Sequence, residues 1–244
     1  MTTNGSTSLR VLVAALLMIV ASACTGSSES TSAGSTSSSS TSSDTPSETP
    51  VTEGISFGPW GTSPVTVLAG LPDGWEDDSD FGALSGPDPA GEAPPDVAVL
   101  FFTADSLYSD PCHWDVAGTG RATAGDVEVG SVRELVAAVG ENTFYTSTDP
   151  SPVTIDGYAG QQLAIQLPDD PFTDCDMDDP DDKGGHAYVF PQSVYVQGPS
   201  NVWDLTILDV DGTRLVAAIL SWPATSQDDL DVARNVVETM DIQI

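Results

Sequence analysis

The chain has 244 residues and a formal net charge of -31, from six Lys and Arg side chains against 37 Asp and Glu. A field of this sign repels phosphate backbones and anionic lipid headgroups, so the composition argues against nucleic-acid binding and against docking on a membrane by charge. Once the N-terminal segments described next are set aside, the length suits one folded domain of under about 200 residues.

The N-terminal stretch Leu9–Cys24 combines one arginine, an apolar run and small residues just before a cysteine. The apolar run is too short for a comfortable membrane span and is typical of a secretion signal. Lipoprotein processing requires small residues there, because the peptidase must seat the chain beside a diacylated thiol, and the stretch resembles a bacterial lipobox. We therefore expect residues 1–23 to be a lipoprotein signal peptide. Cys24 then becomes the lipidated first residue of a protein held on the extracytoplasmic face of the cell membrane.

The alternative is an ordinary secreted protein that is cut near Ala23 and keeps Cys24 as a free thiol.

From the cysteine onward, residues 24–54 consist mainly of Ser, Thr, Gly, Ala and Pro. Such a segment lacks the apolar side chains that a core requires, so we expect a disordered tether between lipid and domain. Its Ser/Thr tract could be O-glycosylated or could be a plain spacer.

Residues 55–244 are expected to form a single extracytoplasmic domain. Two short runs, Val65–Leu68 and Val97–Phe102, predict strands, and the second is apolar on both faces and therefore expected in the middle of a sheet. Ser131 and Glu134 form a capping box that begins a helix. Apolar residues follow at helical spacing, and we expect Gly140 to provide a left-handed stop.

Two Asp-Gly pairs between apolar runs, Asp156–Gly157 and Asp211–Gly212, predict β-hairpins, because both residues accept the positive φ values of a tight turn. The chain closes with a second helix that begins at Ser226 and a short strand from Asp241 to Ile244. This order predicts an α+β fold, with two helices packed on a mostly antiparallel sheet.

Cys112 and Cys175 remain once the lipobox cysteine is set aside, and an even pair in an exported domain predicts a disulfide. His113 and His186 offer the alternative of a two-Cys, two-His zinc site. Adjacent Cys112 and His113 lack the two-residue gap that lets neighbouring ligands share one tetrahedral ion. We therefore favour the disulfide.

Carboxylates alternate around Cys175 in the stretch Asp169–Asp182, an arrangement that suits a hard cation. The candidate calcium ligands are three aspartates: Asp174, Asp176 and Asp178. The helix-loop-helix calcium pattern fails here, because its sharp-turn glycine position holds Asp179 and its closing glutamate position holds Gly185. We favour a solvated acidic loop without a metal.

Few residues suggest catalysis, and we expect no Gly-x-Ser-x-Gly nucleophile elbow. The chain has two histidines, and a hydrolytic triad would have to use His113 or His186 with an unmarked serine, so we assign no catalytic residue and no cofactor. Acidic residues are so abundant that a glycosidase carboxylate pair cannot be picked out. The five tryptophans could stack on sugars, although packing in the core or at its rim is the usual explanation.

Several segments resemble a group of actinobacterial cell-envelope lipoproteins for which no activity is established. They are Leu71–Trp75, Leu107–Trp114, Asp156–Gly160 and Trp203–Gly212. The resemblance spans most of residues 65–244 and includes both cysteines of the domain. The order of elements is also similar to that of the LpqN/LpqT-type mycobacterial lipoproteins, which implies a PsbP-like sandwich.

Together these features predict a lipid-anchored extracytoplasmic domain that binds or scaffolds and does not catalyse. Its partners would be the membrane, through the lipid, and an envelope protein, glycan or lipid. Two alternatives stay open. One is a lipid-, glycan- or small-ligand-binding module with a pocket between helix and sheet, and the other is an envelope hydrolase with an unmarked active site.

Overall fold

The computed structural model describes residues 55–57, 64–78, 82–86, 97–115, 125–170, 172–177, 185–191, 193, 195–196 and 198–244. All of them belong to a compact unit that runs from Glu48 to Ile244. The expected signal peptide (1–23) and tether (24–54), and with them Cys24, lie outside the described residues. None of the helices that the structure describes is long and apolar enough to cross a membrane.

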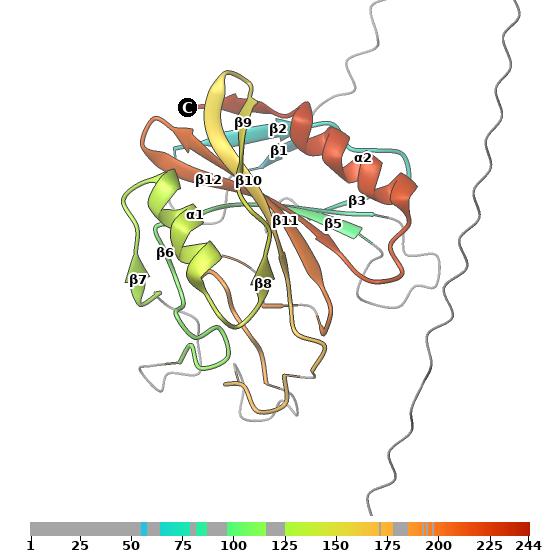
Figure 1. Ribbon diagram of the computed structural model, residues 1–244. Coiled ribbons are helices and arrows are strands. Elements are labelled where there is room, and N and C mark those ends of the chain that lie inside the picture. Colours follow the sequence, from blue (N-terminus) through green and yellow to red (C-terminus); the bar gives the residue numbers. More distant parts are fainter. Residues whose placement is uncertain are drawn as a thin grey trace, which may run out of the picture. The chain divides into compact units, whose positions relative to one another are not determined.

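An eight-stranded antiparallel sheet forms the middle layer of this unit (Figure 1). Its strands are β3 (Glu76–Asp78), β4 (Ala83–Ser85), β5 (Val97–Thr103), β8 (Thr146–Ser147), β9 (Ser151–Ile155), β10 (Tyr158–Gln166), β11 (Val202–Val210) and β12 (Thr213–Ser221). Their order is β3-β4-β5-β12-β11-β10-β8, and β9 also pairs with β10.

Strand β5 contributes to a hydrophobic core on each face of this sheet. Leu100 and Phe102 belong to one core, and Val99 and Phe101 belong to the other. The strand is hydrogen-bonded to β4 on one side and to β12 on the other. The expectation that this doubly apolar run lies inside a sheet is therefore confirmed.

The first core is covered by helix α1 (Val132–Glu141), which lies beside the ribbon of β6 (Ser106–Leu107) and β7 (Val127–Glu128) in Figure 1. The helix begins as predicted, because Ser131 Oγ accepts a 3.2 Å hydrogen bond from the Glu134 N–H. The Glu134 carboxylate accepts in turn from the Gly130 N–H at 2.8 Å, one residue before the expected donor.

The expected left-handed stop at Gly140 is wrong. The helix continues past this glycine and is capped by Asn142, which has an extended backbone with a φ of -68°. The Asn142 side chain donates to the Tyr108 carbonyl at 3.1 Å and accepts from the Phe144 N–H at 2.9 Å. A side chain that ties the helix end to a distant loop takes the place of a glycine cap.

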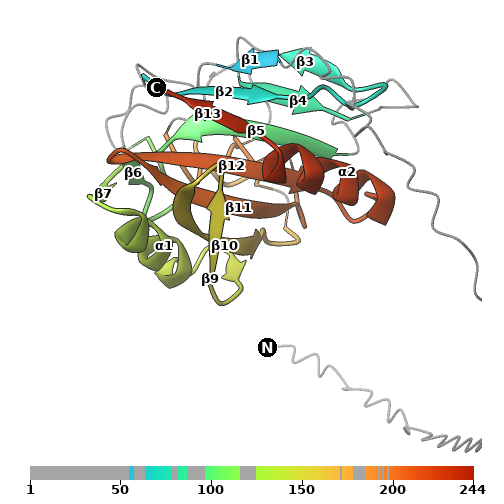
Figure 2. The same ribbon diagram turned by 90° about the horizontal axis from the view of Figure 1, so that it is seen from above.

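The second core lies on the opposite face of the sheet, under helix α2 (Gln227–Glu238) and a small sheet. The small sheet has the order β1-β2-β13 and comprises β1 (Ile55–Phe57), β2 (Thr66–Ala69) and β13 (Asp241–Gln243). Figure 2 shows the small sheet and α1 on opposite sides of β12. The two predicted helices therefore cover different faces, and the fold is α+β as the sequence predicts.

Both predicted hairpins are confirmed. Asp156 and Gly157 have φ values of 47° and 84°, and Asp211 and Gly212 have φ values of 50° and 88°. Positive φ at both central residues defines the type I′ turn, whose twist matches that of the flanking strands.

The two ends of the central sheet differ in chemistry from its middle. Strand β3 stands at one end of the strand order and exposes all three of its residues, Glu76, Asp77 and Asp78. Near the other end, β9 carries an exposed Pro152, which has no backbone N–H to donate.

Candidate functional site

A small cavity of about 50 Å³ lies between α2 and the central sheet. Side chains from β9, β10, β11, β12 and α2 line it: Val153, Ile155, Gln162, Asp204, Thr206, Ile219, Arg234, Val237 and Glu238. A cavity of this size, with polar groups on its walls, has room for a few waters or for a small polar group of a ligand.

The alternation of β11 places Asp204 in this cavity. Trp203, Leu205 and Ile207 point into the core under α1, so Asp204 and Thr206 fall on the opposite face. That face is the one that α2 covers. A carboxylate and a hydroxyl in a central strand are thus brought beneath a helix, where an apolar pair would ordinarily lie.

The Asp204 carboxylate is loosely paired with the guanidinium of Arg234. The Asp204 Oδ2 to Arg234 Nη2 distance is 3.8 Å, and the Asp204 side chain is 31% exposed. Burial raises the pKa of Asp204 above its ordinary value, and the positive charge of Arg234 offsets only part of that rise. Arg234 is shared, because its Nη1 also lies 2.9 Å from the Asp231 carboxylate on the solvent side of the helix.

This arrangement has a definite chemical preference. A partly desolvated carboxylate beside apolar walls, with Gln162 and Thr206 as further polar groups, suits a small group that donates hydrogen bonds. A primary ammonium would add a charge that favours the ionised form of Asp204.

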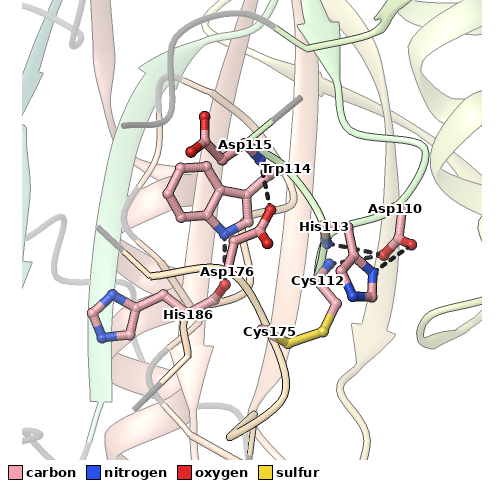
Figure 3. Close-up of a disulfide and its surroundings, with 8 residues drawn as sticks. All are labelled: Asp110, Cys112, His113, Trp114, Asp115, Cys175, Asp176 and His186. Atoms are coloured by element: carbon pink, nitrogen blue, oxygen red, sulfur yellow. Dashed lines mark hydrogen bonds and ion pairs between the residues drawn. A yellow bond between two sulfur atoms is a disulfide. The ribbon is translucent and has the colours of Figure 1, made fainter. Parts of the chain in front are cut away.

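A second cluster surrounds the disulfide, where three loop segments meet (Figure 3). The structure joins Cys112 and Cys175, which are 63 residues apart in sequence and have Cα atoms 4.5 Å apart. The Asp176 N–H donates to the Cys112 carbonyl, and the Asp115 N–H donates to the Asp176 carboxylate, both at 2.8 Å. Because the two sulfur atoms are bonded to each other, neither is a thiolate that could bind zinc.

The two histidines are not brought together. Figure 3 shows the imidazoles of His113 and His186 on opposite sides of the disulfide. His113 Nδ1 lies 2.9 Å from the Asp110 carboxylate, and this hydrogen bond raises the pKa of His113. The His186 carbonyl accepts a 2.6 Å hydrogen bond from Trp114 Nε1. The histidines thus belong to separate contacts.

The candidate calcium ligands are only partly visible. Asp174 is exposed, the Asp176 carboxylate is engaged by a backbone N–H, and Asp178 lies outside the described residues. In the part of the chain that the structure describes, no three His, Cys, Asp or Glu side chains are grouped closely enough to hold a metal ion.

The expected lack of a Gly-x-Ser-x-Gly pattern is wrong for the sequence itself, because residues 54–58 read Gly-Ile-Ser-Phe-Gly. An elbow requires the serine on a sharp turn between a strand and a helix. Ser56 instead lies within β1 and is paired with Leu68 of β2. The sequence pattern therefore lacks the structural context that a serine nucleophile requires.

The tryptophans that the structure describes do not form a sugar platform. Trp75, Trp114 and Trp203 are buried, Trp222 is half-buried, and Trp60 lies outside the described residues. Among the described aromatic side chains, Tyr195 is exposed, at 38%.

Three residues of these sites were missed in the sequence: Asp204, Arg234 and Tyr195. The strand pattern could have revealed Asp204, because a carboxylate on a central strand must face whatever covers that side of the sheet. Tyr195 lies in a stretch without helical or strand periodicity, so no sequence signal marked it.

No protein-family model and no curated protein matches the chain. Among solved structures, the chain is similar to LpqN, described as involved in cell envelope biogenesis of Mycobacterium tuberculosis, with a TM-score of 0.39 and 12% identity over 75% of this chain and 87% of that one. It is also similar to the cyanobacterial PsbP (CyanoP) of Synechocystis, with a TM-score of 0.32 and 7% identity over 73% of this chain and 86% of that one. The loose similarity to LpqN and to PsbP-type proteins that the order of elements predicts is thus found again among solved structures.

Proposed function

We propose that this chain is an extracytoplasmic domain, anchored to the cell membrane by a lipid on Cys24, that binds a ligand and does not catalyse a reaction. The Leu9–Cys24 stretch supports the anchor. The bond between Cys112 and Cys175 supports the location, because disulfides persist in oxidising compartments outside the cytoplasm.

The observation that carries the binding role is the cavity under α2 with Asp204 on its wall. Perturbed pKa values cluster in the clefts of functional sites, so a carboxylate whose pKa burial raises inside a concave site is a candidate ligand-binding group. The matching ligand presents a small ammonium or amide group to Asp204. The net charge of -31 would also attract cationic ligands toward the surface.

Thermal unfolding with small amines tests this proposal, using ethanolamine, cadaverine and glucosamine as probes. A ligand that binds only the native state adds about 2.7 kcal/mol at a concentration of about 100 times its Kd. For a domain of this size that corresponds to a rise of about 5 °C or more in the melting temperature. Sodium chloride at matched ionic strength controls for screening of the acidic surface.

Asp204→Asn should abolish the rise, because it removes the charge on the cavity wall. Asp231→Asn is the matched control, since Asp231 contacts the same Arg234 but does not line the cavity. The proposal fails if no amine raises the melting temperature beyond the salt control, or if Asp204→Asn keeps the full effect.

The anchor has its own test. Cys24→Ala removes the acylatable thiol, so the protein should move from the detergent-extracted membrane fraction to the soluble or precursor fraction. Unchanged fractionation, with no acyl mass on the mature N-terminus, would contradict lipidation. Turnover of a generic ester or glycoside panel that is lost on changing His113 or His186 would favour the hydrolase alternative instead.

A further inference from the structure

An aromatic pair lies at the surface near the disulfide, on elements separate from the cavity under α2. The ring of Tyr195 lies flat on the imidazole of His186, with centroids 4.1 Å apart and an interplanar angle of 7°. Tyr195 is 38% exposed although it is a large aromatic residue. Part of the Tyr195 side chain is therefore in contact with solvent.

The pair is supported from the core by a chain of edge-on ring contacts. Tyr188 meets Tyr195 at 71° with centroids 6.2 Å apart, and Trp114 meets Tyr188 at 72° with centroids 5.0 Å apart. Trp114 is buried, and its indole N–H donates to the carbonyl of His186. The buried Trp114 thus contacts Tyr188 and also holds the backbone of His186.

The backbone of the pair is fixed as well. The His186 N–H donates to the Asp176 carbonyl at 2.7 Å, next to the disulfide at Cys175, and the Val196 N–H donates to the Ala187 carbonyl at 2.8 Å. Both ring-bearing segments are thus held in place before any ligand arrives. A surface whose groups are already ordered loses less conformational entropy on binding than a flexible one does.

A partly exposed aromatic ring that packs on buried neighbours suits the C–H face of a sugar ring. The faces of aromatic rings carry negative charge density, and the axial C–H groups on one face of a pyranose carry partial positive charge. The strongly acidic chain disfavours glycans that carry carboxylates or phosphates. We propose that the Tyr195–His186 pair is a binding site for neutral or amino-sugar glycans.

Saturation-transfer NMR with defined oligosaccharides tests this site. The probes are maltohexaose, cellohexaose, mannohexaose and the chitosan hexamer, with a hexagalacturonate as the anionic counter-probe. We expect saturation transfer to the ring C–H protons of at least one neutral or amino-sugar probe, and none to the counter-probe.

The variants locate the effect. Tyr195→Ala should weaken the affinity by about tenfold, which is the effect of losing one good aromatic contact. Tyr195→Phe keeps the ring and should keep the affinity within about twofold. Comparing the two variants distinguishes the contribution of the ring from that of the hydroxyl. Met177→Ala removes another exposed apolar side chain, 44% exposed, and should leave binding unchanged.

Three results would overturn the proposal: no neutral or amino-sugar probe binds, binding survives Tyr195→Ala, or the anionic probe binds best. Melting curves of the variants show whether each is folded. Tyr195→Leu, which keeps an apolar side chain but lacks the flat ring, takes the place of the alanine variant if that one is not folded. Asp204→Asn should not change the binding of the three neutral probes, whereas the amino-sugar probe could also reach the cavity under α2 through its ammonium groups. A result that refutes glycan binding at Tyr195 is therefore distinguishable from one that refutes ligand binding in the cavity under α2.

Discussion

The Asp156 carboxylate, in the turn between β9 and β10, accepts a 2.8 Å hydrogen bond from the backbone N–H of Ile242 in β13. These residues are 86 positions apart in the chain. The bond links the tip of a hairpin of the central sheet to the small sheet that packs with α2. Asp156 also holds a positive φ of 47°, so one residue both forms the turn and connects two layers.

Asp156→Ala should lower the free energy of unfolding by about 1–3 kcal/mol, because it leaves the Ile242 N–H without this acceptor and places alanine at a positive φ. Asp156→Asn keeps both an acceptor oxygen and the turn preference and should lose less. Urea unfolding measures both. Asp211→Ala is the control, since Asp211 holds a φ of 50° in the other hairpin. Equal losses for Asp156→Ala and Asp211→Ala would show that the Ile242 bond contributes nothing.

Gly160→Ala and Gly140→Ala should change stability in opposite directions. A Cβ at Gly160 would overlap the backbone carbonyl of Ile207 in the neighbouring strand, so the sheet would have to shift. A Cβ at Gly140, inside α1, meets nothing within 4 Å. Gly140→Ala should therefore raise the free energy of unfolding by about 0.5–1 kcal/mol. Denaturant titration of both variants measures these changes. An unchanged free energy of unfolding in Gly160→Ala would contradict the close approach of Gly160 to the Ile207 carbonyl.

Tyr145→Phe should leave the domain as stable or make it more stable, by up to about 1 kcal/mol. Among the described residues, the buried Tyr145 hydroxyl has no hydrogen-bond partner. Burial also raises the pKa of Tyr145 above its ordinary 10.0. Ionisation of Tyr145 therefore leaves the free energy of unfolding unchanged below that pH and lowers it as the pH rises from there through the folded-state value. The phenylalanine variant should lose less stability in alkali, as thermal unfolding from pH 8 upward would show. A clear loss of stability at neutral pH would indicate a hidden partner.

The His113 imidazole should titrate above 6.5, because Asp110 accepts its hydrogen bond and stabilises its charged form. Its contribution to stability is present below pH 6.5 and is lost as the pH rises through the raised folded-state value. Burial pushes the pKa of Asp110 up, but hydrogen bonds from the His113 side chain and from the backbone N–H groups of Cys112 and His113 outweigh this and lower it. In Asp110→Asn the His113 midpoint should fall. An NMR titration that gives the same midpoint in both proteins would refute the pairing.

Removing the disulfide should be costly. In the chain-entropy model, closing a loop of 63 residues removes unfolded-state entropy equivalent to about 4 kcal/mol at 25 °C. The double change Cys112→Ser and Cys175→Ser should therefore lower the urea midpoint strongly. The Cys24→Ala protein, purified oxidised and then denatured, should show no alkylatable thiol, and two reactive thiols would contradict the bond.

Local signals account for the parts of the fold that could be predicted from the sequence. Asp-Gly pairs specify hairpin turns and Ser131 specifies a helix start, because these preferences depend only on adjacent backbone. Gly140 was misjudged as a helix stop because the real cap, Asn142, depends on a carbonyl of Tyr108 that is distant in sequence. A long-range partner overrode a local preference.

The candidate site could be predicted less well than the fold. Counting the cysteines was enough to expect the bond between Cys112 and Cys175. Predicting the cavity would require knowing that α2 covers the face of β11 that carries Asp204. That placement depends on how the whole core assembles. The same holds for the pairing of β2 with β13, which joins the start of the domain to its end.

The acidic residues of β3 and the proline of β9 have a consequence for two copies of this chain that meet. An open sheet edge offers its unused backbone groups to the edge of a neighbour. Carboxylates at Glu76, Asp77 and Asp78 repel their counterparts on a second copy, and Pro152 cannot donate a hydrogen bond to an incoming strand. Close encounters between copies should therefore not convert these domains into a continuous intermolecular sheet.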